Sequence, residues 1–169
     1  MQLLPEIEQR RSIRAYNEAQ IERDVLQRIV DAGRLAPSAK NRQAWRFVVI
    51  TRDEIRAKLR EAAFGQEYVG TAAAIIALCT TNIEYNMPNG IASYPVDLGI
   101  AGAFMMLQAQ HEGLGSCVVT TFREDEVKAV LTVPHRMRVV MLLTVGHPAE
   151  QPEPTGRNAA NRVVGWEHW

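Results

Sequence analysis

Residues 96–111 have the sequence VDLGIAGAFMMLQAQH, in which small and apolar side chains lie on every side of the helix that this stretch predicts. A helix that is apolar all round is buried all round. A domain of 169 residues can seldom enclose a helix completely, so we expect a second copy of the chain to cover one side of it, in a homodimer. Gly99, Ala101, Gly102 and Ala103 would let a helix of the partner approach closely. The alternative is a helix buried deep within a single chain.

Helical patterns continue on both sides of this stretch. Apolar residues at helical spacing predict a helix over residues 22–35. Thr51 with Glu54, and Thr121 with Glu124, have the spacing of a capping box, in which the two side chains satisfy backbone N–H groups at a helix start. We therefore expect two further helices, each opened by one of these threonines.

Short apolar runs bounded by turn residues predict strands at 47–51, 74–80, 116–119 and 138–145. These runs alternate with the helices without a repeated strand–helix–strand unit, and the chain has no internal repeat. We therefore expect a single domain over residues 1–169.

The C-terminal tail, about residues 147–169, has a different composition. Proline and polar residues crowd 151–161, which predicts an extended, irregular segment. Apolar character then returns and ends with Trp166 and Trp169. Two tryptophans are out of place on a tail that contacts only solvent, so we expect this tail to dock on the partner subunit.

Composition and charge exclude several classes of protein. The chain is 47% hydrophobic, and its nineteen Lys and Arg balance nineteen Asp and Glu, so no net charge attracts nucleic acid or an anionic membrane surface. The longest uncharged apolar run, 98–110, is shorter than the ~20 residues of a membrane-spanning helix. The N-terminus lacks the apolar stretch of a signal peptide. Cys79 and Cys117 lie in apolar runs, as reduced core thiols do. We expect a soluble, cytoplasmic protein.

Several chemistry-bearing motifs are missing. The four histidines are scattered and none pairs with Cys or Asp at ligand spacing, so we expect no metal site. There is no G-x-S-x-G elbow and no phosphate-binding P-loop. Redox or group-transfer chemistry would therefore require a bound organic cofactor.

Three local clusters offer groups for binding such a cofactor. RRSIR, residues 10–14, follows a predicted short helix and places three guanidiniums near a hydroxyl, a combination that binds phosphate oxygens, with a solvated charged face as the alternative. APSAKNRQAW, residues 36–45, offers amide groups for the edge of a heteroaromatic ring, or forms a plain connection to a strand. VVTTF, residues 118–122, leads into a helix start that favours an anion or a ring acceptor, or is a plain capping turn.

Together with RRSIRAY, DLGIA and HEGLGS, in the order in which they occur, these clusters resemble the nitroreductase family of flavoproteins. The resemblance runs from about Arg10 to Trp169. It implies an α+β fold with a central mixed or antiparallel sheet flanked by helices, and an intertwined homodimer with two FMN sites at its interface. It also implies ping-pong hydride transfer from NADH or NADPH through flavin N5 to a nitroaromatic, a quinone or a similar small-molecule acceptor.

The resemblance further assigns cofactor-binding roles to individual positions. The residues that match those holding FMN phosphate and ribityl oxygens are Arg10, Arg11 and Ser12, with Arg157 as a late phosphate-binding arginine. Arg14 matches the cation that faces the pyrimidine edge of the flavin. The loop that the second subunit lays against the cofactor is matched by Pro37, Ser38, Ala39, Asn41 and Gln43. The backbone near N5 is matched by Thr120 and Thr121. No residue is assigned as a general acid.

The sequence departs from the family pattern at two places. Ala44 stands where the family often has proline before tryptophan, so a looser entry to the following strand is expected. Residues 81–93 are short where longer members carry the lid helices that often select the substrate, so an open flavin face is expected. Two other functions stay open: a flavin-binding module without nicotinamide turnover, and a specialised flavin-dependent reductase or dehalogenase of one small aromatic. A nucleic-acid-binding module is opposed by the zero net charge.

Overall fold

A computed structural model describes residues 3–169 of the chain. Within that range, four strands form one sheet in the order β1-β2-β4-β3, and every neighbouring pair is antiparallel. The strands are β1 (Trp45–Ile50), β2 (Ala74–Thr80), β3 (Gly115–Val119) and β4 (Arg138–Gly146). All four predicted strands are confirmed, and the expected mixed or antiparallel sheet is antiparallel.

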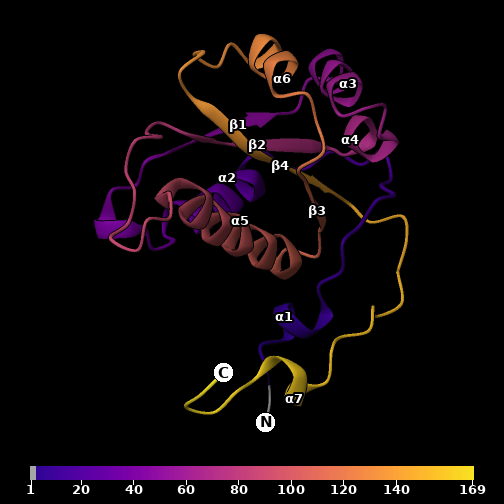
Figure 1. The fold of residues 1–169 in the computed structure, drawn as a ribbon. Helices are drawn as coiled ribbons and strands as arrows, with labels where there is room; N and C mark the ends of the chain where they lie inside the picture. Colours follow the sequence, from indigo (N-terminus) through magenta and orange to yellow (C-terminus); the bar gives the residue numbers. More distant parts are fainter. Residues whose placement is uncertain (1–2) are drawn as a thin grey trace.

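Helices cover both faces of this sheet, so the domain has three layers (Figure 1). One face carries α2 (Arg23–Arg34) and α5 (Ser93–His111), and the other carries α3 (Asp53–Ala62), α4 (Glu67–Thr71) and α6 (Glu124–Leu131). Outside the layers lie α1 (Pro5–Gln9), the 3₁₀ turn η1 (Ala39–Asn41) and α7 (Ala160–Val163). The predicted α+β fold with a sheet flanked by helices is confirmed.

Strand β2 is buried along its whole length, because it lies inside the sheet with helices on both faces. Successive side chains of a strand point to opposite faces. Ile75 and Ala77 accordingly belong to the apolar cluster beneath α3, α4 and α6, whereas Ile76 and Leu78 belong to the cluster against α2 and α5. The sheet is therefore packed on both of its faces.

Helix α5 starts earlier than the predicted residue 96, and only part of its apolar surface is covered by its own chain. Leu98 and Met105 are fully buried, but Val96 is 42% and Phe104 is 40% exposed. A Cβ atom added to Gly99 would meet no other part of the chain within 4 Å. The alternative of a helix enclosed within one chain is therefore wrong, and coverage of the open side by a second copy stays a prediction.

The two predicted capping boxes are wrong, although both helices are present. Helix α3 begins after Arg52 and α6 begins after Arg123, and neither residue makes a side-chain capping hydrogen bond. The Glu124 carboxylate instead accepts hydrogen bonds from Nε of Arg138 and from the backbone N–H of Val139, both at 2.9 Å. Contact with β4 thus replaces the predicted cap.

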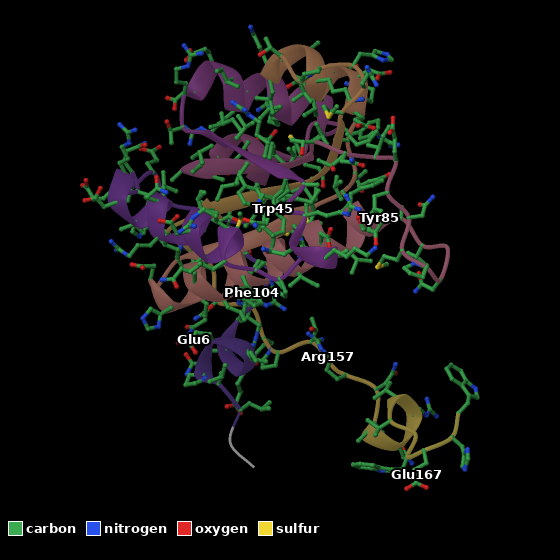
Figure 2. All side chains as sticks on the ribbon, turned by 90° about the vertical axis from the view of Figure 1, so that its left-hand side faces the viewer. Glu6, Trp45, Tyr85, Phe104, Arg157 and Glu167 are labelled. Atoms are coloured by element: carbon green, nitrogen blue, oxygen red, sulfur yellow. The ribbon has the colours of Figure 1, made fainter. Side chains whose placement is uncertain are left out.

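The C-terminal tail extends away from the three layers, and Figure 2 shows Glu167 well outside the body of the domain. Trp166 is 87% exposed and Trp169 is fully exposed. Helix α7 overlaps the last two residues of the 151–161 segment, which was predicted to be irregular. The two tryptophans find no cover on their own chain, so docking of the tail on a partner subunit stays a prediction.

Candidate functional site

The arginine-rich segment that follows α1 is attached to the edge strand β3. The backbone N–H of Ile13 donates to the carbonyl of Ser116 at 3.0 Å, and Ser12 forms a parallel bridge with the same residue. The Tyr16 hydroxyl lies 2.8 Å from the Ile13 carbonyl and 2.8 Å from Oγ1 of Thr144 on β4. These contacts fix the backbone of the segment, so its arginines start from a defined position.

Two glycines of the sheet make this attachment possible. A Cβ atom on Gly115 would lie 2.7 Å from Cγ1 of Ile13, and one on Gly146 would lie 2.6 Å from Cδ1 of Tyr16. Both distances are shorter than side-chain packing allows. The absence of a side chain at both positions therefore lets the arginine segment lie flat against the sheet.

The arginine segment (residues 10–14) and the tail enclose a cavity of about 290 Å³, which we call the arginine cavity. Its walls include Arg10, Arg11, Ser12, Arg14, Glu150, Glu153 and Arg157. The structure thus brings Arg157 together with the N-terminal cluster, across nearly the whole length of the sequence.

The charges in this cavity fit a phosphate monoester. Four guanidiniums face two carboxylates there, which leaves an excess of positive charge. A phosphate monoester carries about −1.5 to −2 charges at neutral pH and accepts bidentate hydrogen bonds from guanidinium groups. The residues present are therefore suited to the phosphate of FMN.

Glu150 is a residue of this cavity that the sequence did not reveal. One of its carboxylate oxygens, Oε1, accepts hydrogen bonds from the backbone N–H groups of Arg14 and of Ala15, the latter at 3.1 Å. The tail therefore holds the backbone at Arg14 and Ala15 in place. No local pattern could have indicated this contact, because the partners are separated by more than 130 positions.

A chain of contacts links Arg14 to the segment after β3. The guanidinium of Arg14 lies 5.9 Å from the centre of the Tyr68 ring. The Tyr68 hydroxyl donates to Oε1 of Gln66 at 2.7 Å, and Nε2 of Gln66 donates to the carbonyl of Thr121 at 3.0 Å. Thr120 and Thr121 are both exposed. Gln66, just before α4, and Tyr68, on α4, thus join two predicted parts of the site. The sequence analysis identified neither residue.

The thiol nearest this region has no sign of reactivity. Cys117 is buried on β3, and this burial raises the pKa of its thiol. Burial also raises the pKa of the Tyr68 hydroxyl. Both groups therefore stay protonated at neutral pH, so neither is a nucleophile or base within the arginine cavity.

The loop at 37–43 lies apart from the arginine cavity in the same chain. In Figure 1 the turn η1, purple at the left edge, is on a different side of the body from α1. The residues predicted from this loop, Pro37, Ser38, Ala39, Asn41 and Gln43, do not line the cavity. That this loop reaches the cofactor of a second subunit stays a prediction.

Internal contacts give this loop a fixed shape. Oγ of Ser38 accepts the backbone N–H of Gln43 at 2.9 Å, and Oδ1 of Asp97 accepts that of Ala39 at 2.9 Å. Lys40, Asn41 and Gln43 have φ angles of 53°, 53° and 50°, in the left-handed region that side chains rarely adopt. A strained backbone of this kind persists only when its surroundings impose it, and it is common in loops that bind ligands.

Residues 3–169 contain no helix with the length and apolarity needed to cross a membrane. In the same range, no three His, Cys, Asp or Glu side chains gather closely enough to hold a metal ion.

Comparisons with known proteins agree with one another. The family model described as "Nitroreductase family" matches residues 7–74 and 64–147. A Thermus thermophilus protein named NADH dehydrogenase is 29% identical, over 93% of this chain and 92% of that protein. A protein of Archaeoglobus fulgidus named putative NADH dehydrogenase/NAD(P)H nitroreductase is 31% identical, over 85% of this chain and 84% of that protein. The structure of NADPH:FMN oxidoreductase from Vibrio harveyi complexed with NAD⁺ has a TM-score of 0.88 at 27% identity, covering 97% of this chain and 76% of that one.

Proposed function

The chain belongs to the nitroreductase family of NAD(P)H-dependent flavin oxidoreductases, and we propose that it transfers hydride from NADH or NADPH, through bound FMN, to a small organic acceptor of the nitroaromatic or quinone type. The observation that carries this proposal is the arginine cavity between the N-terminal segment and the tail. Its excess of guanidiniums and its Ser12 hydroxyl suit a phosphate group, which is the charged end of FMN.

FMN, when bound, would supply the hydride-transfer chemistry between the nicotinamide donor and the acceptor. Arg10, Ser12 and Arg157 would bind the phosphate, and Arg11 would contribute charge while its guanidinium donates to the carbonyl oxygens of Glu8 and Arg10. These residues would bind and orient the cofactor, and no residue is assigned as a general acid.

Arg14 would face the pyrimidine edge of the flavin. Its backbone is held by Glu150 and its guanidinium lies over Tyr68, so the positive charge is placed before the cofactor binds. A fixed charge stabilises negative charge that develops next to it, at no cost of reorganisation. Arg14 would therefore make the flavin easier to reduce. The backbone at Thr120 and Thr121, tied to Gln66, would line the neighbouring part of the ring.

We propose further that the site is completed by a second subunit. The 37–43 loop is shaped but lies away from the cavity of its own chain, and the open side of α5 exposes Val96, Phe104 and a bare Gly99. A homodimer would cover this side and bring the loop of one subunit to the cofactor of the other. The tail at 147–169 would belong to the same single domain and dock on the partner, burying Trp166 and Trp169.

Acceptor choice would follow from the short segment between β2 and α5. Residues 81–92 contain an isolated bridge between Asn86 and Ala92 but no helix, within the described part of the chain. A segment this small leaves little protein to enclose a substrate. We therefore propose a broad range of flat acceptors.

The test is a visible spectrum of the purified protein, followed by anaerobic addition of NADH and then NADPH. A yellow protein that bleaches with either donor and regains its colour with a nitroaromatic or a quinone supports the proposal. A yellow protein that bleaches with neither donor is a flavin-binding module. A colourless protein that takes up no added FMN contradicts the proposed function.

A further inference from the structure

Two cations of the 37–43 loop lie against one aromatic ring. The guanidinium carbon of Arg42 is 3.9 Å, and Nζ of Lys40 is 5.6 Å, from the centre of the Tyr85 ring. Tyr85 belongs to the 81–92 segment and lies at an outer edge of the body in Figure 2. We call these three residues the Tyr85 patch. A guanidinium stacked on a ring keeps its charge and leaves its N–H groups free for an anion.

The patch is preorganised by the backbone beneath it. Asp97 holds the N–H of Ala39, and Lys40 adopts its left-handed conformation immediately afterwards. Directly after the loop, the Ala44 carbonyl accepts a hydrogen bond from the backbone N–H of Thr81 at 3.1 Å. This bond joins the loop to the segment that carries Tyr85. Little ordering is then required when a ligand binds, and this raises affinity.

The charge of the patch is not neutralised. Both cations are exposed, and the ion pairs among residues 3–169 include neither of them. Arg28, Arg60 and Arg138, by contrast, each pair with a carboxylate. Two unpaired cations beside one ring, on a chain with no net charge, form a local site of positive potential.

We propose that Lys40 and Arg42 bind a phosphate group of the nicotinamide dinucleotide. This inference rests on the proposed function, because the patch lies on the loop assigned to the partner's flavin. In the proposed dimer the loop would lie beside that flavin, where the nicotinamide of the donor would bind, and the patch would supply the nearby positive charge for the donor's phosphates. The planar Arg42 group suits two phosphate oxygens at once, and Lys40 adds a point charge. Both the pyrophosphate and the 2′-phosphate of NADPH offer this chemistry.

The test is calorimetric binding of ADP-ribose and of 2′-phospho-ADP-ribose to the FMN-loaded protein. The variant Lys40→Ala/Arg42→Ala is expected to bind at least one compound about tenfold more weakly or worse. Weakening of both compounds alike assigns the pyrophosphate, and weakening of the 2′-phosphorylated compound alone assigns the 2′-phosphate. The control is Lys58→Ala/Arg136→Ala, which removes two exposed cations outside the patch and should bind as the wild type does.

Unchanged affinity of the patch variant for both compounds overturns the inference, as does a wild-type protein that binds neither. If the patch variant loses FMN, the single variants Arg42→Lys and Arg42→Ala are compared in its place. Arg42→Lys keeps the positive charge but lacks the planar guanidinium, so it should weaken binding of the two compounds less than Arg42→Ala does. Reduction of the wild-type flavin by NADH or NADPH is measured separately. A reducible flavin with unchanged affinity contradicts only the patch, whereas a flavin that neither donor reduces contradicts the proposed function.

Discussion

Oδ1 of Asp97, on α5, accepts a hydrogen bond from the backbone N–H of Ala39 at 2.9 Å. Asp97 is only 4% exposed, and its second oxygen, Oδ2, has no hydrogen-bond partner within the described residues. Burying a carboxylate oxygen without a hydrogen-bond partner lowers the free energy of unfolding. The presence of Asp97 here therefore points to a role beyond packing. Asp97 anchors the 37–43 loop at the point where the left-handed backbone begins.

Replacement of Asp97 by alanine should loosen the loop. The variant leaves the N–H of Ala39 without an acceptor, at a cost of about 1–3 kcal/mol in the free energy of unfolding. FMN affinity should fall as well. Asp97→Asn keeps an acceptor oxygen and should bind FMN nearly as the wild type does. FMN titration by fluorescence and urea unfolding measure the two effects. Wild-type FMN affinity in Asp97→Ala would remove Asp97 from this positioning role.

Gly115→Ala should displace the arginine segment from the sheet. Its Cβ would lie 2.7 Å from Cγ1 and 2.8 Å from Cβ of Ile13, and Ile13 is 6% exposed, with little room to move. Overpacking of this kind lowers the free energy of unfolding by about 1–3 kcal/mol. Because the same shift moves Arg10 and Arg14, retention of FMN on gel filtration should fall too. Normal retention combined with normal stability would show that the segment does not depend on this close approach.

The helices and strands were predictable because their signals are local. Leu26, Ile29 and Gly33 are buried on one side of α2, and β2 is a continuous apolar run because both of its faces are covered. Arg10 to Arg14 form a cluster in the sequence itself, so the phosphate hypothesis needed no tertiary information.

Contacts between distant segments could not be predicted in this way. Glu124 was assigned to a cap by its spacing from Thr121, but β4 offers it a guanidinium and an N–H group. Gln66, Tyr68 and Glu150 belong to no motif, and they join the site only because the fold brings α4 and the tail to the arginine segment.

Arg14→Ala and Arg10→Ala should separate reduction from binding. Loss of Arg10 removes charge-assisted contacts to the phosphate and should weaken FMN binding about 10- to 100-fold. Loss of Arg14 should leave more of the FMN in place but slow its reduction by NAD(P)H about tenfold or more, because a charge that favours the reduced flavin is missing. Stopped-flow bleaching of FMN-saturated variants measures the rate. An unchanged rate in Arg14→Ala would exclude its electrostatic role.

The ion pair between α2 and the end of α5 should make the protein sensitive to acid. Nε and Nη2 of Arg28 donate to the two carboxylate oxygens of Glu112 at 2.7 and 2.8 Å. The hydrogen bonds from Arg28, followed by that from Gln108, lower the pKa of Glu112 from 4.5 to about 2. A lowered pKa contributes stability that is fully present above pH 4.5 and is lost as the pH falls toward 2.

Urea unfolding at a series of pH values between 6 and 2 measures this contribution, because this range includes both the ordinary and the lowered pKa of Glu112. The wild type should lose more stability across the range than Glu112→Gln, which has no carboxylate to protonate at this position. High salt should reduce the difference, because Arg28 is half-exposed. Parallel pH profiles for the two proteins would show that the pair contributes nothing.

Phe104→Glu should dissociate the proposed homodimer. Phe104 is 40% exposed on the open side of α5 (Figure 2). It lines a groove with Leu4 and Leu107, beside the pair formed by Glu6 and His111. A carboxylate buried there destabilises an interface strongly, because His111 already pairs with Glu6 and a second acid gains no cation of its own. Light scattering should give twice the chain mass of 18.9 kDa for the wild type and a single chain for the variant, which should also lose FMN because the partner's loop is gone. Phe64→Glu alters a phenylalanine that is 58% exposed outside α5, and it should remain dimeric. A wild type that holds FMN at the mass of one chain would contradict both the dimer and the shared site.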